Sequence, residues 1–206
     1  MPLKELRLRR RRNSRGQALV EFSLVLLPFL TVFIALVEFT FLFASFLSVG
    51  YASHDSAQLA ATYGNASGAD CAVLERVTQD ISAPADQTRI VSVDIFLVNT
   101  ATNGSPVAGK ETIYLYDGGT HPCTKPDGRS IKVPFPYPPA TNGYDVSDRC
   151  NVNQGIGCSR ATVDTLAVQI TYQYQWMTPF PKLIGFLTGT GPQFTQTTIM
   201  RLEPVR

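Results

Sequence analysis

A long apolar run dominates the first quarter of the chain. Within residues 22–52 the only charged residue is Glu38. As an α-helix with a rise of about 1.5 Å per residue, this run would be roughly 46 Å long, whereas the hydrocarbon core of a bilayer is about 30 Å thick. The pattern predicts a transmembrane helix over residues 17–64, which leaves the bilayer near Glu38 and continues through an alanine-rich stretch. We expect Pro28 to kink or locally unwind this helix, because its ring clashes with the preceding turn.

The pattern changes after residue 64. Val73, Val77 and Ile81 recur at helical spacing and predict a short second helix. Apolar and polar positions then alternate with a period of two, which predicts four strands, near residues 90–98, 112–116, 163–177 and 193–203. A long helix followed by a run of strands predicts an α+β fold, in which helix covers one face of a small antiparallel sheet.

Two of the later segments have unusual side chains. Tyr172, Tyr174 and Trp176 alternate with polar residues. They could bind a sugar, but such a ladder is more often the buried face of a strand. Residues 117–160 are rich in proline and glycine and hold three of the four cysteines. Because proline lacks the N–H that a sheet requires, we expect this tract to be a long loop outside any regular sheet, held in place by disulfides.

Basic residues gather at the N-terminus. Residues 1–16 contain seven Lys or Arg and one Glu, and after them no Lys or Arg occurs before Arg76. Because basic residues mark the cytoplasmic end of a span, we expect a cytoplasmic N-terminus and an extracytoplasmic domain. The basic arm should also be attracted to anionic lipid. No aromatic residue is interleaved with the arginines, so we expect no nucleic-acid partner. The apolar run is too long for a cleaved secretory signal, which favours a single-pass anchor.

All four cysteines, Cys71, Cys123, Cys150 and Cys158, follow the span. An even number of cysteines in an exported domain favours two disulfides. We favour a short glycine-containing loop closed by Cys150 and Cys158, which leaves the other two cysteines to pair. The next alternative joins Cys71 to Cys158 and the middle two cysteines to each other. A zinc site is disfavoured, because the chain has no CxxC pair and only two histidines, so we expect neither a metal nor another cofactor.

The segment RGQALVEF, residues 15–22, joins the basic arm to the span. It places Glu21 at the mouth of the apolar run. An unpaired carboxylate costs about 2.5–3.5 kcal/mol at the centre of a bilayer and less near the interface, so it normally has a partner. If the chain were cleaved after Gly16, the new amine on residue 17 would lie on the same helix face as Glu21, in the same chain or in a neighbour. An interfacial glutamate without a partner is the simpler alternative.

The same segment resembles a known signal. A glycine, four uncharged residues, then Glu21 and the aromatic Phe22, between a basic leader and an apolar span, are similar to a type IV prepilin signal. The chain also resembles the TadE-like pseudopilins of the Tad (Flp) pilus machinery. The resemblance rests on RGQALVEFSLVLLPFL, VEFTFLF and SHDSAQLAATYG, within residues 12–64, and more weakly on the C-terminal TTIMRLE.

The resemblance implies a pilin-like fold and a structural role. It implies cleavage between Gly16 and Gln17 by a prepilin peptidase. It also implies that Glu21 and Phe22 act in processing and assembly, and it makes Glu38 a possible subunit contact. The implied partners are other pilins or pseudopilins, the Tad inner-membrane platform and membrane lipid. Gln17 departs from the Phe or Met usual at that position, and the large domain implies a minor component instead of the repeating subunit.

These interpretations divide the chain into a leader (1–16), a membrane and juxtamembrane helix (17–64) and an extracytoplasmic domain (65–206). We find no nucleophile elbow, P-loop or dinucleotide-binding glycine motif, so we expect a structural protein and not an enzyme. The expected location is the inner membrane, with incorporation into a pilus left open. The alternative is an uncleaved single-pass membrane protein whose outer domain binds a ligand or an envelope partner.

Overall fold

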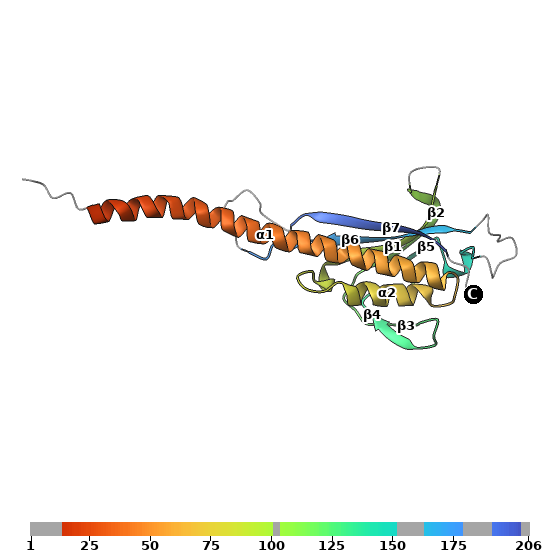
Figure 1. Ribbon diagram of the computed structural model, residues 1–206. Coiled ribbons are helices and arrows are strands. Elements are labelled where there is room, and N and C mark those ends of the chain that lie inside the picture. Colours follow the sequence, from red (N-terminus) through yellow and green to blue (C-terminus); the bar gives the residue numbers. More distant parts are fainter. Residues whose placement is uncertain (1–13, 101–103, 152–162, 179–190, 203–206) are drawn as a thin grey trace, which may run out of the picture.

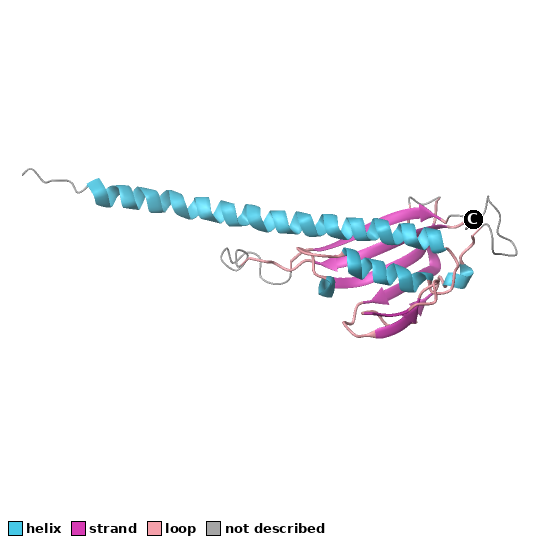
Figure 2. Ribbon diagram, turned by 60° about the horizontal axis from the view of Figure 1, so that its bottom comes forward, coloured by secondary structure: helices cyan, strands magenta, loops and turns pink. Residues whose placement is uncertain are grey.

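A single long helix organises the molecule. In this computed structural model, residues 14–100, 104–151, 163–178 and 191–202 are described. The helix α1 (Ser14–Tyr63) carries a helix-and-sheet domain against its C-terminal half, while its N-terminal half projects away from that domain (Figure 1). The same separation is visible in the turned view, where the strands lie next to α1 and α2 (Figure 2). The predicted α+β arrangement, a long apolar helix followed by an antiparallel sheet, is confirmed.

The helix α1 is continuous over its 50 residues, or about 75 Å at helical rise. Pro28 lies inside it, so of the two expected effects, a kink or local unwinding, the unwinding does not occur. A proline removes one helical hydrogen bond, but its own φ is helical and a small bend relieves the clash. The carbonyl of Pro28 also accepts a hydrogen bond from Thr31 Oγ1 at 2.8 Å.

Small side chains form the inner face of the C-terminal half of α1. Seven residues at helical spacing are fully buried there: Ser45, Val49, Ala52, Ser53, Ser56, Ala57 and Ala60. Their size lets the helix backbone approach the sheet closely. The Ser53 hydroxyl donates to the carbonyl of Val168 on a central strand at 3.0 Å, so a buried polar group is satisfied at this contact.

A second helix, α2 (Ala69–Asp80), packs beside α1 and confirms the predicted short helix. Val73 and Val77 are fully buried on its inner face. Arg76 of α2 links the two helices through an ion pair with Asp55 of α1 at 2.8 Å. It also pairs with Asp80 of its own helix at 2.9 Å. These ion pairs are partly exposed and contribute little, so the buried apolar face supplies most of the packing energy.

The main sheet is antiparallel throughout, and all four predicted strands are present. Its strands, in spatial order, are β5 (Thr141–Asn142), β2 (Pro106–Leu115), β1 (Ile90–Val98), β6 (Thr165–Gln173) and β7 (Gln193–Arg201). The predicted start of the second strand at residue 112 was too late. Pairing with β1 extends β2 back to Pro106, opposite Val98, although the intervening sequence has little strand propensity.

The core lies between the sheet and the two helices. Ile95, Val168 and Ile170 are fully buried there. Tyr172 and Tyr174 are also buried, as expected for the inner face of a strand, whereas Trp176 is half-buried. A short helix η1 (Gln87–Arg89) precedes β1.

The proline-rich tract is more regular than expected. It contains a two-stranded ribbon, β3 (His121–Thr124) with β4 (Ser130–Val133), the short strand β5 of the main sheet, and the helix η2 (Val146–Asp148). The expectation that this tract lies outside any regular sheet was therefore wrong. Pro122 is tolerated because each strand of an isolated ribbon has one edge without a partner. Residues 152–160 of the tract lie outside the described residues.

A disulfide holds this tract against the helices. Cys71 in α2 and Cys123 in β3 are bonded, with their Cα atoms 5.9 Å apart, which confirms this half of the favoured pairing. Cys150 is disulfide-bonded as well, whereas Cys158 lies outside the described residues.

Candidate functional site: the N-terminal helix and its junction with the domain

The N-terminal part of α1, before Glu38, is largely exposed and is not covered by the described part of the domain. Apolar side chains surround it on all sides and are exposed, with Leu19 at 69 % and Phe22 at 63 %. Within the described residues, α1 is the one helix with the length and apolar composition to cross a membrane. A helix that is apolar all round belongs in a bilayer or a protein core, and here no protein core covers it.

The residues of the RGQALVEF segment lie at the free end of this helix. Gln17 and Glu21 share one face, and Gln17 Nε2 donates to Glu21 Oε1 at 2.9 Å. Phe22, the next residue, is also exposed. Gly16 has no other atoms near the position where a side chain would begin, so its backbone is accessible from outside. The structure thus places all four residues within about two exposed turns of helix, away from the domain.

Glu38 marks the point where the domain meets the helix. Its side chain is 3 % exposed, and its carboxylate accepts hydrogen bonds from three residues of the segment after β6. The Tyr174 hydroxyl donates to Oε1 at 2.7 Å, the Met177 N–H to Oε1 at 2.9 Å and the Thr178 N–H to Oε2 at 2.8 Å. We call this arrangement the Glu38 clamp. The residue considered as a subunit contact therefore uses its carboxylate within its own chain.

The clamp also sets the length of helix that is left bare. The stretch from Gln17 to Glu38 is about 32 Å long at helical rise, close to the roughly 30 Å of a bilayer core. Trp176 lies next to the clamp, half-buried, with its ring edge-on to Tyr174 at 5.8 Å between centroids. Tryptophan favours the membrane–water interface, so its position fits a membrane boundary at Glu38.

An apolar groove of about 370 Å³ lies just beyond the clamp, on the domain side. It runs between α1 and the start of β7 and is lined by Phe39, Leu42, Phe43, Phe46, Pro192 and Phe194. The rings of Phe46 and Phe194 are 5.4 Å apart and join the two walls. The aromatic side chains of this groove extend the apolar surface of the helix past Glu38.

Comparison with known proteins agrees with this reading of the helix. Residues 16–58 match the family of TadE-like proteins. The matched segment begins at Gly16 and includes Glu21, Glu38 and the inner face of α1, which confirms the resemblance. No curated protein and no solved structure matches the chain. The TadE-like match supports a membrane-anchored protein associated with the Tad pilus, a setting in which such proteins have structural roles.

Sequence reasoning found the helix residues but not their partners in the domain. The partners of Glu38 lie 136–140 residues further along the chain, and two of them donate through the backbone, so no side-chain pattern could identify them. Among the described residues, no three His, Cys, Asp or Glu side chains cluster as metal ligands would.

Proposed function

We propose that this protein is a minor pilin or pseudopilin of the Tad (Flp) machinery. The observation that carries the proposal is the TadE-like match over residues 16–58, which coincides with the exposed apolar helix and its junction with the domain. A domain with its own sheet and disulfide, attached to one membrane helix, suits a structural component that presents a folded head outside the membrane. Its partners would be other pilins or pseudopilins, the inner-membrane platform of the machinery and lipid.

The proposal includes processing by a prepilin peptidase between Gly16 and Gln17. Cleavage there would remove the basic leader, residues 1–16, and create a positive amine on residue 17. Because Gln17 and Glu21 already share a helix face, that amine would lie near the Glu21 carboxylate of its own chain or of a neighbour. The mature protein would consist of the helix 17–64 and the domain 65–206.

The proposed orientation has the N-terminus in the cytoplasm and the domain outside the inner membrane. The basic residues of the leader support it, because they flank the cytoplasmic ends of spans. Disulfide bonding supports it too, since disulfides persist in oxidising compartments outside the cytoplasm.

Intact mass spectrometry of the membrane-purified protein tests the processing step. The chain co-expressed with its matching prepilin peptidase should lack residues 1–16. Gly16→Trp should remain full-length, because a large side chain would obstruct access to the scissile bond. A wild-type protein that still begins at Met1 or Pro2 in the presence of active peptidase would contradict the proposal. That result would favour the alternative, an uncleaved single-pass protein whose outer domain binds a ligand or an envelope partner.

A further inference from the structure

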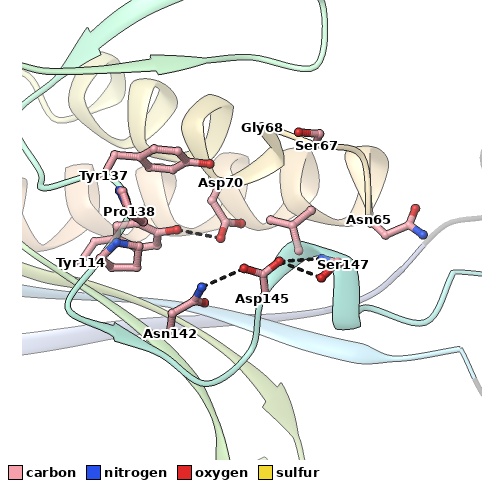
Figure 3. A pocket seen from close by; sticks show the side chains of 12 residues that line it. Asn65, Ser67, Gly68, Asp70, Tyr114, Tyr137, Pro138, Asn142, Asp145 and Ser147 are labelled. Carbon is pink, nitrogen blue, oxygen red and sulfur yellow. Dashed lines mark hydrogen bonds between the residues drawn. The ribbon is translucent and has the colours of Figure 1, made fainter.

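A second cavity lies at the end of the domain farthest from the exposed N-terminal half of α1. It has a volume of about 340 Å³ and opens between the turn after α1, the start of α2 and the proline-rich tract (Figure 3). The turn follows Tyr63, about 38 Å along α1 from Glu38. Eight polar side chains line the cavity: Asn65, Ser67, Asp70, Tyr114, Tyr137, Asn142, Asp145 and Ser147. The inference does not depend on the proposed pilin role.

The floor of the cavity is a buried ion pair. Asp70 is 2 % exposed, and its Oδ1 lies 2.6 Å from Nη2 of the fully buried Arg149. Its Oδ2 accepts a hydrogen bond from the Tyr114 hydroxyl at 2.8 Å. Burial, together with Asp70, raises the pKa of Tyr114 far above its usual range, so this hydroxyl remains a donor. Because Oδ1 is paired with the Arg149 guanidinium and Oδ2 accepts from Tyr114, the charge of Asp70 is compensated at the floor of the cavity.

The rim of the cavity is negative. Asp145 accepts hydrogen bonds from Ser147 N at 2.9 Å, Ser147 Oγ at 3.0 Å and Asn142 Nδ2 at 2.8 Å. These donors, the Ser147 N–H foremost, lower the pKa of Asp145, which stays ionised at neutral pH. None of the twelve lining residues is Lys, Arg or His. The pocket therefore disfavours phosphates, carboxylates and other anions.

The remaining wall offers both donors and acceptors beside a flat ring. The side chains of Asn65, Ser67 and Tyr137 have no hydrogen-bond partner among the described residues, and all three line the cavity. The half-buried ring of Tyr137 stacks on Tyr114 with centroids 6.2 Å apart and an interplanar angle of 9°. Amides and hydroxyls both donate and accept, whereas an organic cation would use the acceptors alone and leave the donors unpaired.

We propose that this pocket binds an uncharged saccharide of one or two sugar units. Sugar hydroxyls donate and accept on the same atom, which suits the amides and hydroxyls of the wall. The C–H face of a sugar ring is apolar and suits an aromatic ring such as Tyr137. The volume lies at the lower end of the roughly 300–1,000 Å³ usual for ligand pockets.

The walls of the pocket are fixed before a ligand arrives. The disulfide at Cys71 follows Asp70 directly in α2, and the ion pair at Arg149 holds the proline-rich tract to the same helix. Gly68 has a φ of +83° and lies against the Thr124 carbonyl, so the turn before α2 is packed closely under the ribbon. Walls fixed in this way reduce the entropy lost on binding.

Saturation-transfer NMR of the full chain in lipid nanodiscs tests the proposal. The probes are glucose, N-acetylglucosamine, cellobiose and chitobiose, with glucuronate as an anion and n-butylamine as a cation. At least one neutral sugar should bind at millimolar concentration. Tyr137→Ala should weaken that binding about tenfold or more, or ~1.4 kcal/mol. Tyr137→Phe should lose less, because it keeps the ring.

Two further variants make the result specific. Ser67→Trp fills the exposed mouth of the cavity without removing a core contact and should abolish binding. Asp148→Asn is the matched control, since Asp148 is the last residue of η2, whose N-cap is Asp145, pairs with Lys110 at 3.0 Å and does not line the cavity. It should bind as the parent does. Absence of binding by every neutral sugar, preference for n-butylamine or glucuronate, or binding unaffected by Tyr137→Ala and Ser67→Trp would overturn the proposal.

Discussion

The Glu38 clamp should determine how firmly the domain is held to its membrane helix. Glu38→Leu keeps the size of the side chain but removes the acceptor for Tyr174 Oη and for the N–H groups of Met177 and Thr178. A hydrogen bond to a charged group contributes about 1.5–3 kcal/mol, and a buried donor left without a partner costs about 1–3 kcal/mol. Because these effects share one carboxylate and are not additive, we expect a loss of about 3–5 kcal/mol at this junction.

Amide hydrogen exchange of the full chain in nanodiscs measures this loss directly, since two of the three donors are backbone amides. In Glu38→Leu, exchange at Met177 and Thr178 should accelerate by about a hundredfold or more, each tenfold step being about 1.4 kcal/mol. Glu38→Gln should affect the two amides differently. Its amide oxygen can replace Oε1 and keep the bond from Met177, whereas its amide nitrogen would face the Thr178 N–H, so protection should fall mainly at Thr178.

Glu21→Leu is the matched control for this experiment, because Glu21 lies on the same helix but is exposed and far from the domain. Its exchange at Met177 and Thr178 should equal that of the parent. If Glu38→Leu also left both amides as protected as in the parent, the Glu38 hydrogen bonds would not stabilise the junction. That result would refute the prediction.

Three other predictions concern Glu21, the disulfide and the buried ion pair. Glu21→Ala should insert normally but co-purify less partner pilin, and undiminished co-purification would contradict the assembly role. Replacing Cys71 and Cys123 by Ser should lower the free energy of unfolding of the domain by about 2–4 kcal/mol without releasing the protein from the membrane, as denaturant titration and membrane fractionation would show. Arg149→Met should cost about 3–5 kcal/mol, because Asp70 would remain buried and charged. The double variant Asp70→Asn, Arg149→Met should recover part of that loss, and equal losses in both would exclude the charge as the cause.

The sequence alone determined the elements whose pattern is local. The apolar run defined α1, since a run of that length and composition is sufficient for a membrane-spanning helix. Periodicity identified α2 and four strands, because the burial of one face imposes a period of 3.6 or 2 on the side chains that cover it. The family resemblance rested mainly on local segments within residues 12–64, and the family match covers residues 16–58 of them.

Tertiary structure decided the features that join distant parts of the chain. The partners of Glu38 are separated from it by most of the sequence, and two are backbone groups that every residue possesses. The regular strands of the proline-rich tract arise from pairing between segments, and the strand propensity of the individual residues does not predict that pairing. The pocket likewise combines residues from the turn after α1, from α2, from β2 and from the proline-rich tract. Their proximity depends on the buried Asp70–Arg149 pair and on the Cys71–Cys123 bond, contacts whose energy exists only once the chain has folded.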